Sequence, residues 1–487
     1  MKKSISIITL SLLVGGATLP VYAADATAAH GATTSGTDVA SLQKQIAELN
    51  QKMAALECAQ KNSEAVAKEA AVVAAKKEVQ ASGPIASSGP ASQWPKGYID
   101  VPGTNSAIKF GGFVKTDFIY EANGPTSNLS DDNSFDPATM PVKGTNADNI
   151  SASKSGQTHA HARGTRLNME TVSNTEKGPL KTFVEFDFLG GSSNSTSYTP
   201  RLRHAYGEFQ GFLAGQTFSN FLDMDAIGTQ LDSNGIAATA PRQPLLKYTT
   251  NLNQAVTFAV SAEKPDSDYV DPTGASKDND NDGVSGFPDL TGQLRWKGDM
   301  GHLSFRGLAR QVQAKTPAGA TGYTGTGFTG KSTGWGLGIS GKLNFTNMTA
   351  LFAQLNGGNA IGRYLFDGYQ SFYYNAAKSH FATRRAYQGV FGIEQKLTET
   401  VRANIALAHE QISNPTAIMV QDGATGLYNR KVQKVIGNVI YSPIPKVDVG
   451  LEVSHGRREV LYLASGQSAT TKAVSGTRVQ AVALYKF

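Results

Sequence analysis

Several arginine residues of this chain alternate with other side chains in segments that have the composition of β-strands. Successive side chains of a strand point to opposite faces of a sheet, so residues two apart share a face. In RLRHAY, Arg201 and Arg203 therefore share a face with Ala205 and Gly207, which leaves two guanidinium groups side by side with little bulk around them. Guanidinium groups bind carboxylates with bidentate geometry, so such a face predicts affinity for small organic anions.

Residues two apart on other predicted strands identify further candidate arginines for anion binding. Arg166 shares a face with Asn168 and Glu170, and Arg295 shares one with Gln293. Arg306 lies on the face of Ser304 and Arg310. The candidates from parity are Arg166, Arg201, Arg203, Arg295 and Arg306. A second reading stays open, in which each arginine pairs with a neighbouring Asp or Glu and stiffens the wall.

An acidic segment has the spacing of a calcium-binding loop. Asp278, Asp280 and Asp282 alternate with asparagine and precede a glycine, and Asp289 lies eleven residues after Asp278. This imitates the ligand spacing of an EF-hand, although Asp replaces the usual last Glu and the flanks resemble strand and loop instead of helix. The sequence therefore leaves two readings: a Ca²⁺ site, or an acidic external loop that is simply solvated.

No motif for catalysis is present. His159 and His161 could lie on one side of an extended segment, but no third metal ligand is near them, and surface histidines are the simpler reading. The chain has no GxSxG, HExxH, P-loop or Rossmann glycine pattern. We therefore expect no catalytic residues, no enzyme activity and no cofactor beyond the possible Ca²⁺.

The N-terminus predicts export from the cytoplasm. Met1, Lys2 and Lys3 precede an apolar run, and small residues lead to Ala23, which predicts a signal peptide over residues 1–23. Beyond it, no run reaches the ~18 to 20 apolar residues that a transmembrane helix needs. The single cysteine, Cys58, excludes an intramolecular disulfide framework. The exported chain is therefore expected to be soluble or a β-barrel.

Residues 24–80 form an N-terminal region with a short predicted α-helical coiled coil over about residues 38–77. Its apolar residues are spaced alternately by three and four: Val39, Leu42, Ile46, Leu49, Met53 and Leu56. A solitary amphipathic or disordered helix is the alternative. Residues 81–97 are rich in Pro, Gly and Ser and have almost no charge, which predicts a linker.

Residues 98–487 alternate apolar and polar side chains over segments of roughly eight to ten residues, the pattern of a transmembrane β-barrel. In KVDVGLEV, one face carries Val447, Val449, Leu451 and Val453, and the other carries Lys446, Asp448 and Glu452. The polar segments 122–158 and 264–282 are too long for the turns of a β-sandwich and fit external loops. At roughly 24 residues per strand and connection, we expect an all-β barrel of about 16 antiparallel strands.

The net charge of +6 does not predict nucleic-acid binding, because the basic residues alternate with apolar ones instead of forming a tail or one helix face. A positively charged lumen explains this distribution better. Glu170, Glu185 and Asp187 would then oppose the arginines across the channel and create a transverse field.

The chain ends in VQAVALYKF, with Val479, Ala481, Ala483, Tyr485 and Phe487 on one face. This segment resembles the last strand of outer-membrane barrels, whose terminal aromatic residue serves assembly. The segments KFGGFVKTDFIY, RLRHAYGEF, LAGQTFSNF and RQPLLKYT, together with the coiled coil and linker, are similar to the DcaP-like porin family. The resemblance covers nearly all of the mature chain.

The resemblance implies a sixteen-stranded homotrimeric porin in the bacterial outer membrane, with the coiled coil on the periplasmic side and a basic constriction for small carboxylates. It carries over Arg201, Arg203 and Arg242 as constriction residues, together with Arg166. Arg384 and Arg385 are adjacent, so at most one of them faces the lumen.

The sequence thus favours a channel for passive diffusion of small organic anions, with outer-membrane lipid and lipopolysaccharide as its surroundings. Two alternatives remain: a surface-display or adhesin barrel with a closed lumen, and an outer-membrane barrel hydrolase.

Overall fold

The computed structural model describes residue 44 and residues 94–487 except 124–134, 145–154, 191–197, 234–235, 237–239, 267, 271–285, 317–327, 366–370, 376–379, 414–425 and 464–469. The chain divides into two units, Met1–Ala91 and Ser92–Phe487. The predicted signal peptide and coiled coil lie outside the described residues, apart from Lys44, which is helical. No helix in the described part of the chain is long and apolar enough to cross a membrane.

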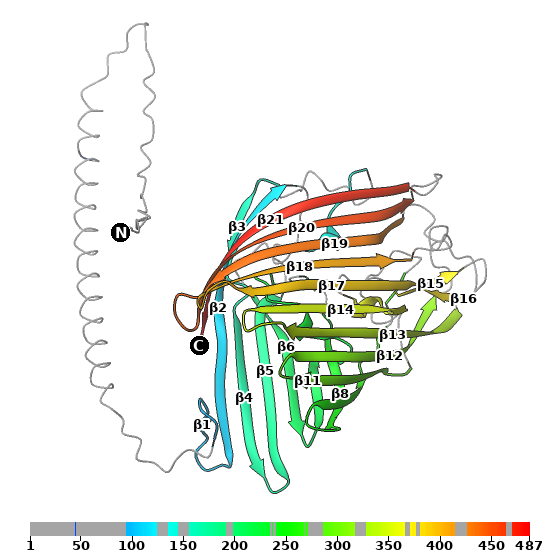
Figure 1. Ribbon diagram of the computed structural model, residues 1–487. Helices are drawn as coiled ribbons and strands as arrows, with labels where there is room; N and C mark the ends of the chain where they lie inside the picture. Colours follow the sequence, from blue (N-terminus) through cyan, green and yellow to red (C-terminus); the bar gives the residue numbers. More distant parts are fainter. Residues whose placement is uncertain are drawn as a thin grey trace. The chain divides into compact units, whose positions relative to one another are not determined.

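Sixteen antiparallel strands close into a barrel (Figure 1). They are β2 (Ser106–Asn123), β4 (Arg166–Thr175), β5 (Gly178–Gly190), β6 (Thr199–Phe209), β7 (Phe212–Phe218), β8 (Arg242–Asn251), β9 (Val256–Glu263), β11 (Asp289–Gly298), β12 (Gly301–Thr316), β13 (Phe328–Asn344), β14 (Thr349–Asn359), β17 (Arg385–Lys396), β18 (Val401–Ile412), β19 (Gly426–Tyr441), β20 (Val447–Leu463) and β21 (Thr470–Lys486). Each pairs with the next, and β21 pairs with β2, so the sheet has no free edge. The predicted barrel and strand number are confirmed.

The remaining strands are short. β1 (Ile99–Asp100) and β3 (Thr158–His161) pair with β2. β10 (Tyr269–Val270), β15 (Phe372–Asn375) and β16 (His380–Thr383) form a separate small sheet. In the parts of the connections that the structure describes, there are three 3₁₀ turns: η1 (Pro137–Thr139), η3 (Met224–Ala226) and η4 (Gly362–Tyr364).

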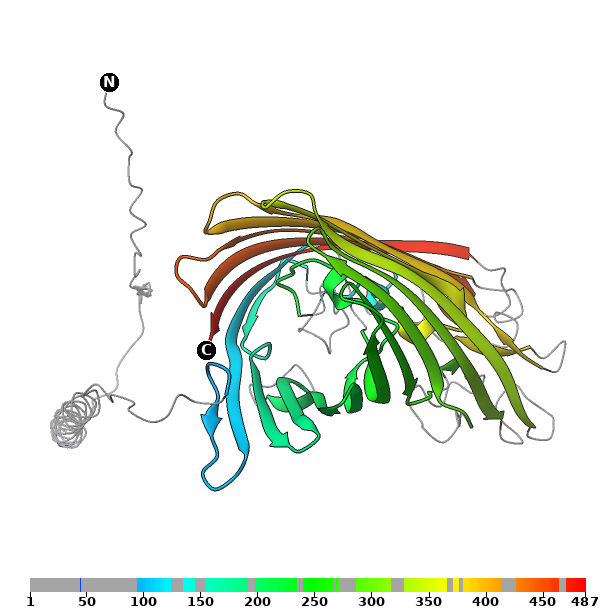
Figure 2. The same ribbon diagram turned by 60° about the horizontal axis from the view of Figure 1, so that its bottom comes forward.

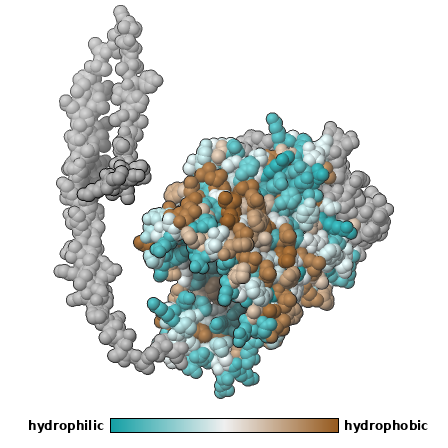
Figure 3. Space-filling view, in the orientation of Figure 1, coloured by the Kyte–Doolittle hydropathy of each residue, from teal (hydrophilic) through white to brown (hydrophobic). Residues whose placement is uncertain are grey.

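The alternation of side chains follows the two solvents of a membrane barrel. On β20, Val449, Leu451 and Val453 are 44–52% exposed, whereas Glu452 between them is 1% exposed. The exposed apolar side chains form a band on the outer wall, with hydrophilic side chains on either side of it (Figure 3). The apolar face therefore meets lipid and the polar face meets the lumen, as the sequence predicts.

Short turns gather at one end of the barrel and long connections at the other. Gln210 and Gly211, both with positive φ (50° and 84°), make the two-residue turn between β6 and β7. Two consecutive positive φ values are typical of the tight turn that matches strand twist. Barrels of the outer membrane have short turns on the periplasmic side, so the long connections lie on the outer side.

The described residues of the connection between β7 and β8, which are 219–233, 236, 240 and 241, fold inward against the opposite wall. Its residues Phe221 and Leu222 are buried with side chains of β12, β14 and β17, and Leu231 is buried with side chains of β19 and β21. Figure 2 looks obliquely along the barrel and shows part of this green connection inside the ring of strands. We call these described residues the inward segment. It narrows the lumen.

Hydrogen bonds from two backbone N–H groups fix the middle of the inward segment to β20. The Glu452 carboxylate accepts from the backbone N–H of Leu231 (2.8 Å) and of Asp232 (3.0 Å), and also from the Asn438 amide (2.9 Å). The connection between β2 and β3 packs beside it, since the Phe135 N–H donates to Asp232 (3.0 Å). A loop that approaches the wall in this way keeps its polar backbone groups satisfied.

Candidate functional site

The candidate site is a cluster of four arginines at the long-connection ends of neighbouring strands. Arg166 is the first residue of β4, Arg242 is the first residue of β8, and Arg201 and Arg203 lie near the start of β6. Leu202, between the last two, is 50% exposed on the lipid side, so Arg201 and Arg203 face the lumen. Arg242 interacts electrostatically with Arg166, Arg201 and Arg203. The structure therefore brings together the four arginines that the family resemblance implies.

Asp187 holds two of the arginines together. Arg201 donates to both of its carboxylate oxygens, from Nε (3.0 Å) and Nη2 (2.7 Å), and Arg203 donates to it from Nη1 (2.8 Å). Arg203 also donates from Nε to Glu185 (2.7 Å). Asp187 has no exposed side-chain surface. This ion-pair network fixes where the guanidinium groups lie, as the wall-stiffening reading expects for Arg203.

The predicted placement of the acidic residues opposite the arginines is wrong. Glu185 and Asp187 lie on β5, which pairs with β4 on one side and β6 on the other, and Glu170 lies on β4 itself. The carboxylates are therefore beside the arginines on the same wall. Sequence parity assigned a face of the sheet but gave no position around the barrel.

The cluster has more positive groups than negative ones. Arg166 reaches Glu185 only at 3.9 Å and stacks over the Phe113 ring at 5.4 Å. Arg242 stacks over Phe218 at 5.2 Å, and no carboxylate of the described residues lies within 4 Å of it. Among the described residues, four guanidinium groups thus share two carboxylates, and the side chain of Arg201 remains 37% exposed. An anion that reaches this wall finds donors whose charge is not fully neutralised.

A β-bulge corrects the predicted parity of β6. Glu185 pairs with His204 and Phe186 pairs with Leu202, so Arg203 is the extra residue. Below the bulge the even residues face the lumen, and Arg203 does not share its face with Ala205 and Gly207. His204, which the sequence argument missed, joins the site: its ring lies 5.0 Å from that of Phe218.

Arg295 and Arg306 also face the lumen, but they bind the inward segment. Arg295 donates to Asp225 (2.5 Å) and lies 3.5 Å from Asp223. Arg306 donates from Nη1 to the Phe221 carbonyl (2.6 Å) and to Gln354 (2.6 Å). These two candidates therefore shape the lumen by anchoring the segment, and they do not belong to the arginine cluster.

Asp223 is the centre of this anchor. Its Oδ2 accepts from Ser340 Oγ (2.6 Å) and lies 2.9 Å from Nε2 of His302, while its Oδ1 accepts from the Asp225 N–H (3.2 Å). Burial would raise the pKa of this carboxyl, but the hydrogen bonds from His302 and Ser340 and the charges of His302 and Arg295 outweigh burial and lower the pKa to about 2. Asp223 is therefore charged at neutral pH.

Asp223, Asp225 and His302 place three possible metal-ligand atoms within 4.8 Å of one another. However, each oxygen of Asp223 already accepts hydrogen bonds, and the Arg295 guanidinium occupies the space beside both carboxylates. A fixed positive charge there opposes a divalent cation. The residues fit an ion-pair anchor better than a metal centre.

The other candidates are placed only in part. Asp278, Asp280 and Asp282 lie outside the described residues, so the calcium loop stays a prediction. Asp289 is buried and accepts from the Tyr364 hydroxyl (2.7 Å) with Arg310 at 3.4 Å. Of the adjacent arginines, the one at position 384 is buried and the one at 385 is exposed, as predicted.

The two histidines of β3 differ in exposure, since the His159 side chain is 20% exposed whereas His161 is buried. His161 is buried and lies 3.5 Å from Asp117, and His159 lies 3.9 Å from Glu121. The surface reading of His161 is therefore wrong, because β3 places it on the lumen side of β2.

Comparison with known proteins gives the family. The model of the family described as DcaP outer membrane protein matches residues 29–471. The crystal structure of the outer membrane channel DcaP of Acinetobacter baumannii is 22% identical, with a TM-score of 0.63 over 80% of this chain and 99% of that chain. At this identity the likeness shows a shared fold.

More remote likenesses are found to OmpT of Vibrio cholerae (9% identity, TM-score 0.46, 80% of this chain and 100% of that one) and to the anion-selective porin from Comamonas acidovorans (11%, 0.44, 78% and 100%). Both are too distant to enter the argument. A search of curated proteins found no match.

Proposed function

The chain belongs to the DcaP outer membrane protein family, and from that premise we propose that it is a channel for passive diffusion of small organic anions, chiefly carboxylates. It is an outer-membrane barrel of bacteria with the fold of a known channel. Anion preference, the solute class and a homotrimeric assembly are parts of the proposal, as is the absence of enzyme activity.

The observation that carries the proposal is the excess of guanidinium groups beside the lumen. Arg201 and Arg203 are held in place by Asp187, while Arg242 has no carboxylate partner among the described residues and Arg201 stays partly exposed. Fixed charges in a narrow space attract counter-ions and repel ions of like sign. The planar donor fork of arginine also suits a carboxylate.

The inward segment supports the same function by bringing its own backbone and side chains into the lumen. It begins directly after Phe218, whose ring stacks on Arg242, and ends directly before Arg242. The arginine cluster therefore lies where the segment leaves the wall and returns to it. A solute that passes the narrowed part of the lumen passes close to the exposed guanidinium groups.

The test is the reversal potential of purified protein in a planar bilayer under a salt gradient, with single-charge variants. A unit charge roughly 6 Å from the ion contributes about 0.7 to 2.8 kcal/mol as the dielectric constant falls from about 80 to 20. We expect Arg242→Gln to lower the anion-to-cation permeability ratio about threefold or more. Arg201→Gln should act in the same direction.

Arg385→Gln is the matched control, because Arg385 lies on the exposed outer face next to the buried Arg384. It removes the same charge without changing the lumen, so the permeability ratio should stay at the wild-type value. A wild-type channel without anion preference, or equal effects of Arg242→Gln and Arg385→Gln, would refute the proposal. Absence of conductance would favour a display barrel with a closed lumen.

A further inference from the structure

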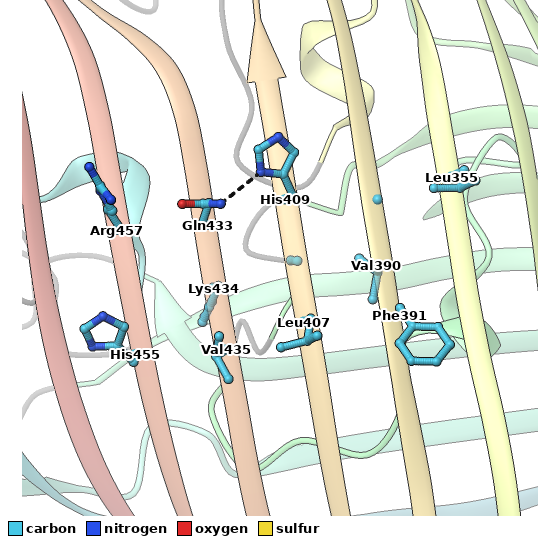
Figure 4. A pocket seen from close by; sticks show the side chains of 12 residues that line it. Leu355, Val390, Phe391, Leu407, His409, Gln433, Lys434, Val435, His455 and Arg457 are labelled. Carbon is cyan, nitrogen blue, oxygen red and sulfur yellow. Dashed lines mark hydrogen bonds between the residues drawn. The ribbon is translucent and has the colours of Figure 1, made fainter. Parts of the chain in front are cut away.

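A row of polar side chains crosses the outer wall of the barrel over β18, β19 and β20. His409 lies directly opposite Gln433 in the register of β18 and β19, and Gln433 lies opposite Arg457 in that of β19 and β20. His455 lies two residues before Arg457 on the same strand. Gln433 donates to His409 at 3.3 Å (Figure 4). We call His409, Gln433, His455 and Arg457 the outer polar row.

The row faces the lipid side and not the lumen. Leu407, Val435 and Val453 have the same parity on the three strands and are 43–47% exposed. The residues of opposite parity, Glu410, Lys434 and Arg458, are buried on the lumen side. The outer polar row is therefore set among side chains that contact lipid tails.

The outer polar row lies at the outer edge of the apolar band, as its height across the membrane indicates. Arg457 is ten residues beyond Val447, the first residue of β20 after a short turn. At about 3.3 Å per residue and a tilt of about 40°, this raises it by about 25 Å, close to the height of the apolar band. Val449, Leu451 and Val453 fill the band below it. The row thus lies where the head groups of the outer leaflet begin.

The row lines one side of a hollow of about 540 Å³ in the outer wall. Apolar side chains, among them Leu355, Phe391, Leu407 and Val435, line the hollow beside the polar ones (Figure 4). A ligand that fits it has a polar or charged end next to apolar chains. This is the arrangement of a lipid at the boundary between head group and tail.

The positive charge of Arg457 indicates that the polar end of the ligand is an anion. Arg457 is exposed, and no carboxylate of the described residues lies within 4 Å of it. An unpaired guanidinium at the edge of a lipid band is costly unless an anion compensates it. Arginine forms short, bidentate hydrogen bonds to phosphate, and the neighbouring imidazole and amide groups supply more donors.

We propose that the outer polar row binds a phosphate group of an outer-leaflet glycolipid, the lipid A part of lipopolysaccharide, with an acyl chain in the adjoining apolar hollow. A second copy of the chain fits less well. Of the described strand residues that face outward at this height, the acidic one is Glu459, and it already pairs with Arg430 at 2.9 Å. A neighbouring subunit would therefore bring no unpaired carboxylate from these strands to Arg457.

Lipid binding by the outer polar row depends on the outer-membrane location alone, so it can be tested independently of anion transport. The experiment titrates the detergent-purified protein with lipid A that carries two phosphates and measures bound lipid by native mass spectrometry. Parallel titrations use lipid A from which the phosphates have been removed, and inorganic phosphate as a competitor. Arg457→Gln is the main variant and Gln433→Glu is a second one, which adds a negative charge to the row.

We expect Arg457→Gln to weaken binding of lipid A about tenfold, as the loss of one charge-assisted bidentate contact predicts. Gln433→Glu should weaken it at least as much, and the dephosphorylated lipid should bind the wild type as weakly as lipid A binds Arg457→Gln. Lys331→Gln is the control, since Lys331 is an exposed cation on β13, outside the row.

Three results would overturn the proposal. Equal binding by the wild type and Arg457→Gln would exclude the row as the site. Full displacement of lipid A by millimolar inorganic phosphate would show a site for free anions and not for a lipid. A variant that loses its oligomeric state while its lipid binding stays normal would show that a second copy covers the row.

Discussion

Replacement of Asp223 by asparagine should release the first part of the inward segment. Both carboxylate oxygens of Asp223 accept hydrogen bonds: Oδ1 accepts from the Asp225 N–H and Oδ2 accepts from Ser340. His302 and Arg295 lie next to the same two oxygens at 2.9 and 3.5 Å. An asparagine side chain is neutral and has one acceptor oxygen, so it cannot accept hydrogen bonds on both sides as the carboxylate does, and it no longer pairs with the Arg295 charge.

The pKa of Asp223 gives the size of the effect. It is lowered from 3.8 to about 2, which corresponds to about 2 kcal/mol of stabilisation of the charged carboxylate in this position. Because the pKa is depressed, this contribution is fully present above about pH 4 and is lost as the pH falls towards 2. Loss of the charge in Asp223→Asn should therefore loosen the local anchor by about 2 kcal/mol.

Hydrogen exchange of backbone amides in the inward segment measures this loosening directly. A change of about 2 kcal/mol in local opening corresponds to roughly thirtyfold faster exchange, provided that exchange occurs from the opened state. The amide of Asp225 is a direct reporter, because it donates to Asp223. We also expect larger and noisier single-channel conductance, since a loosened segment obstructs the lumen less.

Asp225→Asn is the matched control for this prediction. The Asp225 side chain is 67% exposed and contacts Arg295 at the lumen surface, so its loss should cost at most about 1 kcal/mol. Wild-type exchange rates in Asp223→Asn, or equal acceleration in both variants, would show that the buried carboxylate does not hold the segment.

Three further predictions follow from other contacts. Glu452→Gln should leave one of its backbone donors, such as the Leu231 N–H, without an acceptor, and should make the middle of the inward segment more sensitive to protease in the folded barrel. Arg478→Met should remove the ion pair between β21 and β2 and leave the charge of the buried Glu121 without a partner from Arg478. We expect the free energy of unfolding to fall by about 3 to 5 kcal/mol, measured as a lower temperature of heat-induced unfolding in detergent. Gly215→Ala should also lower the unfolding temperature, because Gly215 has φ +137° and an added Cβ would lie 2.2 Å from a backbone oxygen of β6. An unchanged unfolding temperature in Arg478→Met or in Gly215→Ala would contradict the prediction for that variant.

The barrel could be predicted from sequence because the two solvents impose a simple rule. Water fills one side of the wall and lipid the other, so side chains alternate with period two whatever their neighbours are. The pattern of KVDVGLEV survives in the structure from Val447 to Val453, with Leu451 exposed and Glu452 buried, whereas Lys446 lies in the turn before β20. Because this rule is local, it predicts which residues of a single strand face the lumen, but it does not predict where each strand lies around the lumen.

The candidate site could be predicted in type but not in detail. Period two breaks wherever the backbone inserts a residue, and the bulge at Arg203 changes which side of β6 faces the lumen. His204 entered the site for that reason. The positions of Glu185 and Asp187 beside the arginines depend on strand order, because β5 lies between β4 and β6. No spacing along one strand contains that information.

The inward segment escaped prediction because its apolar residues have no regular period, since each meets a different strand. The composition of the connection nevertheless predicts that it folds inward. Full burial of a large apolar side chain is worth about 1.5 to 3 kcal/mol, so a long connection that carries Phe221, Leu222, Leu231 and Ile236 must fold against a surface. Its polar backbone excludes the lipid side, which leaves the lumen. The composition of 271–285 is polar and acidic and creates no such requirement. Apolar content, more than length, is therefore the feature that distinguishes a connection that narrows the lumen.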